Sequence, residues 1–436
     1  MGRETGKEHK GSPVPPAVSR RGFVLGSAAA AATASAATVL SLDGCGSTSA
    51  SAELTQGVQA QFPDAQVEYL AVASSQVERH TNMTTLDSAD YLAEVHSFEL
   101  PLGSLVYQSS DTQALVVAPG ASSQSLIRFG FVAFESGSFT PALGQALGSS
   151  EDYVIYDARA SALALAWVEC NMVHGQWRVY ATPLENGTAS EQALQQAQLL
   201  DEGEGSYSPP QLAVAGRKIY WNVMPDPNGP ASSEDSYLKA AEFSSTRSGA
   251  SAEPWTVYTS HGRMITNPLV SGDVLTFVPR VDTDAVYYQL TSLDIATDAV
   301  QHIAILPPSV RVSDAVWLDS GFAFGIEGNY DYAEGLSLFG SYQQLGEGQY
   351  LYINKAPVSA LVQVKQHSFV KSTKNVLGLD TSAGTAIIVD TPQDCVAYGD
   401  ILAGSGVQNR LVVYTTVTSR IGQEKGTCRV RVFDHH

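Results

Sequence analysis

The residues best suited to chemistry in this chain gather in one loop, Glu327-Gly-Asn-Tyr330-Asp331-Tyr332-Ala-Glu334. Tyrosine side chains give contact area at a low entropic cost, and carboxylates can bind sugar hydroxyls or basic groups. We therefore predict that Glu327, Tyr330, Asp331, Tyr332 and Glu334 form a binding surface. An ordinary exposed hairpin loop is the alternative interpretation.

The motifs of common catalytic and cofactor sites do not occur in the sequence. Gly-x-Ser-x-Gly would indicate a nucleophile elbow, His-Glu-x-x-His a zinc protease, and Gly-x-x-x-x-Gly-Lys a phosphate loop. We therefore assign no catalytic residue, no metal ligand and no cofactor. The sequence favours a non-enzymatic role and leaves the question of catalysis open.

The charge of the chain narrows the choice of partners. The 436 residues include 25 Lys and Arg against 44 Asp and Glu, and residues 1–44 contain five of the basic and three of the acidic residues. The remainder has 20 basic and 41 acidic residues, a net charge of −21. Such a surface repels nucleic acid and anionic lipid headgroups. We expect an envelope protein or a small ligand as the partner, and no nucleic acid.

Three cysteines follow Cys45, and their odd number allows at most one internal disulfide. Cys395 and Cys428 both lie in the last strand-rich segment, so we predict that they pair. Cys170 would then be a free buried thiol. The sequence has no Cys-x-x-Cys, which argues against a zinc knuckle.

Strand patterns dominate the chain beyond the N-terminal region. A unit of two apolar runs joined by a turn, often followed by a third run, recurs about every 45–58 residues, for example Gln211–Val214 before Lys218–Trp221. Units of three or four antiparallel strands at this period are typical of β-propeller blades. We predict an all-β propeller of seven blades, with six blades as the runner-up and a two-layer β-sandwich as the competing architecture. Tryptophans inside the apolar runs, Trp167, Trp221 and Trp317, are predicted to lie in the core.

Gln66–Val72 reads as a strand that precedes the first repeat. Propellers commonly close when one terminus contributes a strand to the blade made by the other terminus. We therefore predict that Gln66–Val72 pairs with the C-terminal strand Thr427–Phe433.

The N-terminal region resembles a twin-arginine (Tat) export signal, with Ser19-Arg20-Arg21-Gly22-Phe23 followed by an uncharged, alanine-rich run. The resemblance rests on Arg20, Arg21 and Phe23, and it implies export of a folded protein by the Tat translocation machinery. Leu42-Asp43-Gly44-Cys45 resembles a lipobox, which implies lipidation at Cys45 and a membrane contact through the lipid alone. Cleavage after Ala52 is the alternative. The protein would be extracytoplasmic in both cases, as an anchored lipoprotein or as a secreted protein.

These observations divide the chain into a signal segment (1–45), a flexible tether (46–60) and a propeller domain (61–436). Over roughly residues 100–434 the chain resembles the exported β-propellers of the WD40/TolB-like superfamily, in architecture rather than in motifs. The export signal, together with a repeat scaffold that lacks a catalytic set, favours a non-catalytic scaffold of the cell envelope that binds a ligand or protein. The alternative is an extracellular hydrolase or lyase, acting on glycans or peptides, with its site at the mouth of the central channel.

Overall fold

We analysed a computed structural model of the chain. It describes residues 47–436 except for the following positions: 123–124, 149–151, 230–232, 248, 284, 309, 320, 330–333, 347, 355–360, 374, 396–398 and 418–425. The chain divides into two compact units, Met1–Thr48 and Ser49–His436, and every described strand belongs to the second unit. No helix among the described residues is both long enough and apolar enough to cross a bilayer.

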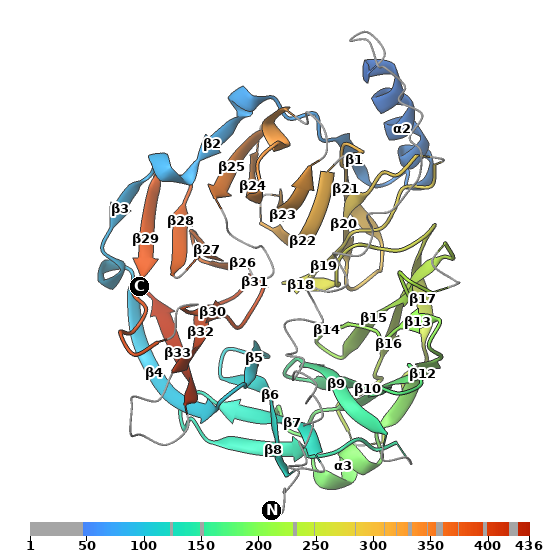
Figure 1. Cartoon of the computed structure of the whole chain (residues 1–436), viewed down its shortest axis with the longest axis vertical. Helices are drawn as coiled ribbons and strands as arrows, with labels where there is room; N and C mark the ends of the chain where they lie inside the picture. Colours follow the sequence, from blue (N-terminus) through green and yellow to red (C-terminus); the bar gives the residue numbers. More distant parts are fainter. Residues whose placement is uncertain are drawn as a thin grey trace, which may run out of the picture. The chain divides into compact units, whose positions relative to one another are not determined.

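The described strands form seven sheets that stand in a ring around a central axis, so the fold is an all-β propeller (Figure 1). We number the sheets in chain order. The first contains β5 (Leu105–Gln108), β6 (Gln113–Ser122), β7 (Ser125–Ala133) and β8 (Phe139–Leu143). The second contains β9 (Tyr153–Ala160), β10 (Ala164–Asn171), β11 (Trp177–Pro183) and β12 (Gln198–Gly203). The third contains β13 (Tyr207–Ser208), β14 (Leu212–Ala215), β15 (Lys218–Pro225), β16 (Ser236–Glu242) and β17 (Trp255–Ser260).

The other four sheets each include one strand from the N-terminal part of the chain. The fourth contains β18 (Leu269–Ser271), β19 (Val274–Phe277), β20 (Gln289–Asp294), β21 (Val300–Ile305) and β1 (Gln66–Tyr69). The fifth contains β22 (Val310–Leu318), β23 (Gly321–Asn329), β24 (Gly340–Gly346), β25 (Gln349–Asn354) and β2 (Val77–Arg79). The sixth contains β31 (Gly406–Val407), β26 (Leu361–Val364), β27 (His367–Lys371), β28 (Val376–Asp380), β29 (Thr385–Val389) and β3 (Thr84–Leu86). The seventh contains β30 (Ile401–Leu402), β32 (Arg410–Val417), β33 (Thr427–His435) and β4 (Leu92–Pro101).

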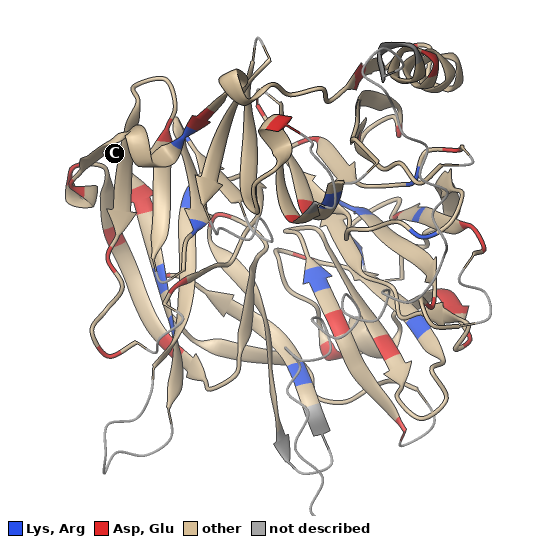
Figure 2. Cartoon of the chain, turned by 45° about the horizontal axis from the view of Figure 1, so that its top comes forward, with Lys and Arg blue, Asp and Glu red and all other residues tan. Residues whose placement is uncertain are grey.

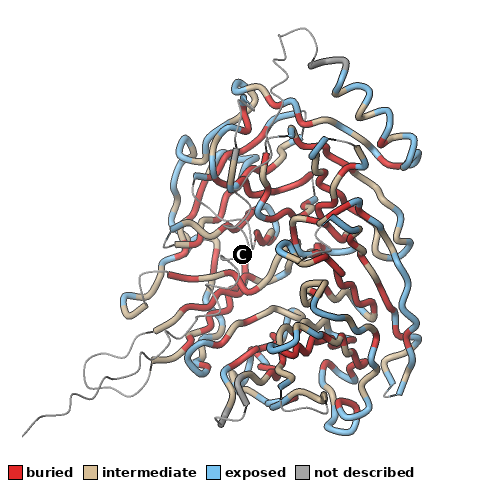
Figure 3. The backbone as a smooth tube through the Cα atoms, turned by 45° about the vertical axis from the view of Figure 1, so that its right-hand side comes forward, coloured by how far each residue is buried: buried red, intermediate tan, exposed pale blue. Residues whose placement is uncertain are grey.

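The core lies between neighbouring sheets, as continuously apolar strands predict. Every residue of β10 and of β15 is buried. Side chains of these two strands, among them Val168 and Trp221, meet in one apolar cluster. Adjacent sheets therefore cover each other's faces. Figure 3 shows buried stretches of the chain concentrated in the interior and exposed stretches in peripheral loops and in the helix α2.

The strand that closes the ring differs from the predicted one. Gln66–Val72 does not pair with the C-terminal strand, because β1 runs parallel to β21 with Gln66 opposite His302. Instead β4 pairs antiparallel with β33, from Leu92 opposite His435 to Pro101 opposite Thr427. The difference lies in the length of the pairing. β4 has ten residues and pairs with β33 from Leu92 to Pro101, whereas β1 has only four residues.

Three short strands precede β4 along the outside of the ring. β1, β2 and β3 pair in parallel with the outer strands β21, β25 and β29 of three successive sheets. Figure 1 shows this segment, in blue, following the rim of the propeller. We call residues 66–101 the N-terminal belt. Because an outer strand otherwise leaves unpaired backbone groups, the belt covers three sheet edges and closes the fourth.

Helices play a small part in the fold. α2 (Ser47–Gln61) occupies positions where the sequence predicts a flexible tether at 46–60. Val58, in α2, packs with Ile303 and Ile305 of β21. Contact with an apolar surface stabilises a helix that would be marginal alone, which explains the difference. The other helical elements in the described part of the chain are α3 (Glu191–Gln195) and the single turns η1 (Ser74–Gln76), η2 (His80–Asn82), η3 (Ser88–Asp90) and η4 (Glu334–Leu336).

The predicted disulfide between Cys395 and Cys428 does not form, and both thiols are free, as is the buried Cys170. Cys428 is buried, with its Sγ 3.7 Å from the carbonyl oxygen of Ser104. Cys395 pairs with Val417 of β32, and Val417 pairs with Thr427, the residue before Cys428 in β33. Because directly paired residues share a face and successive residues of a strand point to opposite faces, Cys395 and Cys428 lie on opposite faces of the seventh sheet.

Candidate functional site

A groove with a volume of about 510 Å³ opens between the fourth and fifth sheets. One wall comes from β1 and β21, and the other comes from the β22–β23 and β24–β25 hairpins. We call it the rim groove. The side chains that give it its chemistry are Glu68, His302, Trp317, Asp319, Gln344, Gln349 and Tyr350.

A stacked pair of rings forms the apolar part of the rim groove. The rings of His302 and Trp317 lie 4.2 Å apart between centroids, with an interplanar angle of 15°. Phe322 packs edge-on against Trp317 at 4.8 Å. The backbone N–H of Trp317 donates to the Oγ1 atom of Thr276 at 2.8 Å, which ties β22 to the fourth sheet. Contacts from two sheets therefore fix the position of the ring pair.

Trp317 faces the groove because of the alternation of side chains along β22. Its neighbours Val316 and Leu318 are fully buried in a core cluster on the other face, whereas Trp317 is only half-buried. The sequence predicts Trp317 in the core, as it does Trp167 and Trp221. That prediction is correct for Trp167 and Trp221, which are 0% exposed, and only partly correct for Trp317.

The side chain of Gln344 connects the two walls. Its Nε2 atom donates to Glu68 Oε1 at 2.9 Å and to the Tyr350 hydroxyl at 3.1 Å. Its Oε1 atom accepts the backbone N–H of Phe322 at 2.7 Å. A Cβ atom at Gly321 would lie 2.7 Å from this oxygen, so only glycine allows the close approach. Burial raises the pKa of Tyr350 to about 12, so that its hydroxyl remains protonated.

The rim groove is acidic. Glu68 and Asp319 supply two carboxylates, and none of the described residues that line the groove is Lys or Arg. Asp319 Oδ2 accepts from Gln363 Nε2 at 2.8 Å, which leaves the second oxygen available. Burial lowers the pKa of His302, with Glu68 opposing, so the imidazole is neutral at pH 7. Elsewhere, acidic and basic residues are interspersed over the sheets (Figure 2).

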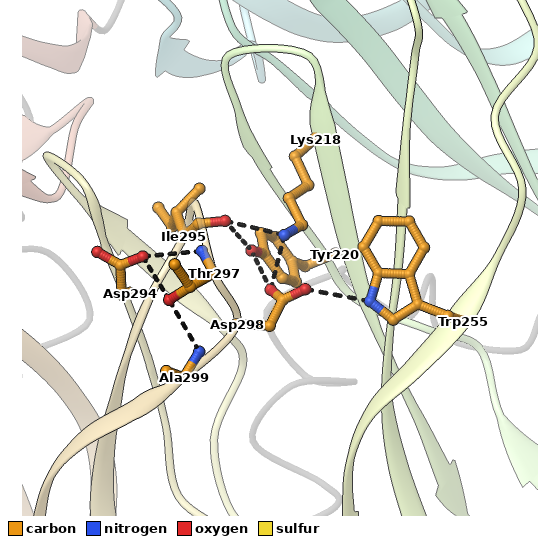
Figure 4. Close-up of polar contacts among 8 residues, drawn as sticks. All are labelled: Lys218, Tyr220, Trp255, Asp294, Ile295, Thr297, Asp298 and Ala299. Carbon is orange, nitrogen blue, oxygen red and sulfur yellow. Dashed lines mark hydrogen bonds and ion pairs between the residues drawn. The ribbon is translucent and has the colours of Figure 1, made fainter. Parts of the chain in front are cut away.

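A second polar cluster joins the third and fourth sheets (Figure 4). Asp298 Oδ1 accepts from Lys218 Nζ at 2.7 Å and from the Tyr220 hydroxyl at 2.9 Å. Asp298 Oδ2 accepts from the indole N–H of Trp255 at 3.1 Å. Lys218 is only 5% exposed. We call these four residues the Asp298 cluster and assign it a structural role, because both carboxylate oxygens are already hydrogen-bonded within the protein.

Near the central axis, the charged side chains of β9 are likewise paired. Arg159 forms an ion pair with Asp157 and stacks on the ring of Tyr107 in β5, with 3.7 Å between the guanidinium carbon and the ring centroid. These contacts join the first and second sheets. They leave the groups engaged with each other rather than with a substrate.

The loop that the sequence singles out is only partly described. Glu327 lies in β23 and Glu334 in η4, and both are exposed. Tyr330, Asp331 and Tyr332 lie outside the described residues, so the binding surface stays a prediction. Arg20, Arg21, Phe23 and Cys45 also lie outside them. Among the described residues, no group of three or more His, Cys, Asp or Glu side chains is arranged to hold a metal ion.

Sequence reasoning missed the rim groove. Glu68 and Gln344 are far apart in the chain, and their contact depends on the unforeseen pairing of β1 with β21. The one local signal is at Trp317, which is followed closely by the exposed Asp319 at the end of an apolar run. An aromatic residue beside a polar turn suits a groove wall as well as a core.

No family model and no curated protein matches the chain. Several solved structures resemble it. A prolyl endopeptidase matches with a TM-score of 0.45 and 12% identity, over 85% of this chain and 50% of that chain. A polysaccharide lyase matches with a TM-score of 0.48 and 9% identity, over 77% and 90%. The β-propeller domain of the Trilobed protease from Pyrococcus furiosus matches with a TM-score of 0.43 and 10% identity, over 76% and 97%. The chain spans about half the length of the prolyl endopeptidase and puromycin hydrolase chains that it matches, and these likenesses say nothing of its activity.

Proposed function

We propose that the chain is an exported β-propeller of the cell envelope that binds a ligand without transforming it, and that the ligand occupies the rim groove. The observation that carries the proposal is the preformed geometry of this groove. Its ring pair and its Gln344 network are fixed by contacts from both walls. A concave site with an apolar wall and a few convergent polar groups is typical of ligand-binding sites.

The proposal extends to the finer architecture and to the location of the protein. Seven blades, one for each sheet, are supported by the hydrogen-bonded strand order. Export is supported by the twin-arginine pattern at Arg20 and Arg21. Mass spectrometry of the mature N-terminus would distinguish lipidation at Cys45 from cleavage after Ala52.

Hydrogen exchange on the full chain tests the function. Defined soluble probes, namely neutral oligosaccharides, acidic oligosaccharides and basic peptides, would be added one class at a time. Saturable protection of residues 66–68 and 344–350, with no product in the same mixtures, supports binding at the rim groove. Protection near the axis at β9 together with product formation would instead support the hydrolase or lyase alternative.

A further inference from the structure

The chemistry of the rim groove indicates a class of ligand, an inference that rests on the proposed binding function. We propose that the groove binds a short segment of a neutral, hydroxyl-rich glycan. The His302–Trp317 ring pair would contact the apolar face of one sugar ring. Glu68, Asp319 and the amide of Gln349 would bind its hydroxyl groups.

The charge of the groove disfavours anionic ligands. Glu68 and Asp319 place two negative charges at the site, and none of the lining residues that the structure describes is a Lys or Arg that would offset them. The neutral imidazole of His302 adds no positive charge at pH 7. A phosphate, sulfate or uronate group would therefore enter against repulsion, in a protein whose net charge is already strongly negative.

The ring pair gives the groove a fixed apolar wall. The His302 ring stacks on one face of Trp317 at 4.2 Å between centroids. Because Phe322 packs edge-on against the indole, little side-chain entropy remains to be lost when a ligand binds. A fixed apolar wall of this kind matches the C–H face of a pyranose ring.

The polar groups of the groove are of the types that hydrogen-bond to hydroxyl groups. Glu68 and Asp319 each accept one neutral amide donor from the protein, and each keeps acceptor capacity for another donor. The exposed Gln349 amide can both donate and accept. A hydroxyl also donates and accepts, whereas an ammonium group only donates. An exposed ion pair would add at most about 1 kcal/mol, so basic peptides gain little here.

The size of the groove agrees with a short oligosaccharide. Its volume of about 510 Å³ lies within the range of roughly 300–1,000 Å³ that is usual for small-molecule sites.

Isothermal titration calorimetry on the full chain tests the inference. The probes are maltopentaose, cellopentaose and chitopentaose as neutral glycans, pentagalacturonate as an anionic glycan, and pentalysine as a cationic peptide. We expect saturable binding of at least one neutral glycan, with at least tenfold weaker binding of pentagalacturonate and pentalysine. Trp317→Ala should weaken the neutral glycan at least tenfold, and Trp317→Phe should restore part of the loss.

The matched control is Phe339→Ala, which removes an aromatic side chain that is 59% exposed and does not line the groove. It should leave glycan binding unchanged. Thermal unfolding of each variant shows whether it is folded.

The outcomes separate the inference from the proposed function. Preferential binding of pentalysine or pentagalacturonate that depends on Trp317 would overturn the glycan inference and leave the binding function intact. Glycan binding that does not change in folded Trp317→Ala would overturn the assignment to the rim groove. Absence of saturable binding by every probe class, together with no protection in hydrogen exchange, would count against the proposed function itself.

Discussion

Replacing Asp298 by asparagine should lower the free energy of unfolding by about 3 kcal/mol, because it removes the negative charge that faces the buried Lys218. Lys218 Nζ would then keep neutral acceptors such as the carbonyl oxygen of Ile295, at 2.8 Å. Lys218 Nζ lies 2.7 Å from Asp298 Oδ1, and the two side chains are only 6% and 19% exposed. At an effective dielectric constant of about 20, two unit charges at this distance attract each other by about 6 kcal/mol. Desolvation of both groups offsets part of this attraction.

Asparagine is the informative substitution for two reasons. Asp298 has a φ of +57°, in the left-handed region that asparagine also tolerates. Alanine there would add a backbone cost of about 1–2 kcal/mol that has nothing to do with the ion pair. The asparagine amide also turns an N–H group toward at least one of the three donors that now bind the carboxylate, so a hydrogen bond is lost together with the charge.

The matched control is a neighbouring ion pair at the surface. Arg217 and Glu242 approach to 3.8 Å, with side chains 38% and 46% exposed. Glu242→Gln should therefore cost at most about 1 kcal/mol, and high salt should remove the effect. The loss in Asp298→Asn should persist at high salt, because a buried pair is little screened.

Urea unfolding followed by circular dichroism measures these differences as shifts in midpoint at constant m-value. Adding Lys218→Met to Asp298→Asn removes the uncompensated charge, and the double variant should recover more than half of the lost stability. Equal losses in Asp298→Asn and Glu242→Gln would refute the reasoning. So would a double variant that is no more stable than Asp298→Asn.

Three further predictions concern ring closure, acid sensitivity and the thiols. Leu100 in the closing strand β4 is 3% exposed, so Leu100→Ala should leave a cavity and lower the free energy of unfolding by about 2–5 kcal/mol, as measured by thermal unfolding. Leu102 is 47% exposed, and Leu102→Ala should leave the stability unchanged. His367 Nδ1 and His435 Nε2 lie 2.8 Å apart, and burial lowers the pKa of both. As the pH falls, the unfolded chain therefore binds protons before the folded one does, so the free energy of unfolding should decrease below about pH 6.5. His367→Gln should reduce the dependence of the urea midpoint on pH. In denaturant without reductant, an alkylating reagent should label all three cysteines described in the structure; a mass that shows two thiols protected would contradict the free-thiol assignment.

The propeller can be predicted from the sequence because strands that are buried between two sheets consist of consecutive apolar residues. Ile219–Trp221 is an uninterrupted apolar and aromatic run, and all of β15 is buried. The pairing of the N-terminal strands β1 to β4 cannot be recognised from a local sequence pattern of this kind. Val77–Arg79 has only three residues, and its parallel pairing with β25 depends on where the belt lies in space. The cysteine prediction failed for a related reason, since proximity in sequence does not show which face of a sheet each thiol occupies.

The candidate site could not be predicted because its two walls meet only after the belt is in place. β1 supplies Glu68, and the contact of this carboxylate with Gln344 spans 276 positions of the chain. Neither residue lies in a motif, and each alone is an ordinary polar side chain on a strand. Trp317 and His302 are similarly unremarkable until β22 and β21 are packed together.

The formation of the rim groove therefore depends on the position of the N-terminal belt. A four-stranded fourth sheet would end at β21 and would present His302 on an unpaired outer strand. Pairing of β1 with β21 places Gln66 opposite His302 and Glu68 opposite Ala304, which extends the wall outward and adds a carboxylate to it. The segment that covers the sheet edge thus also adds the Glu68 carboxylate to the groove. Loss of β1 pairing should expose a sheet edge and reduce ligand binding together, even though Trp317 and Phe322 stay in place.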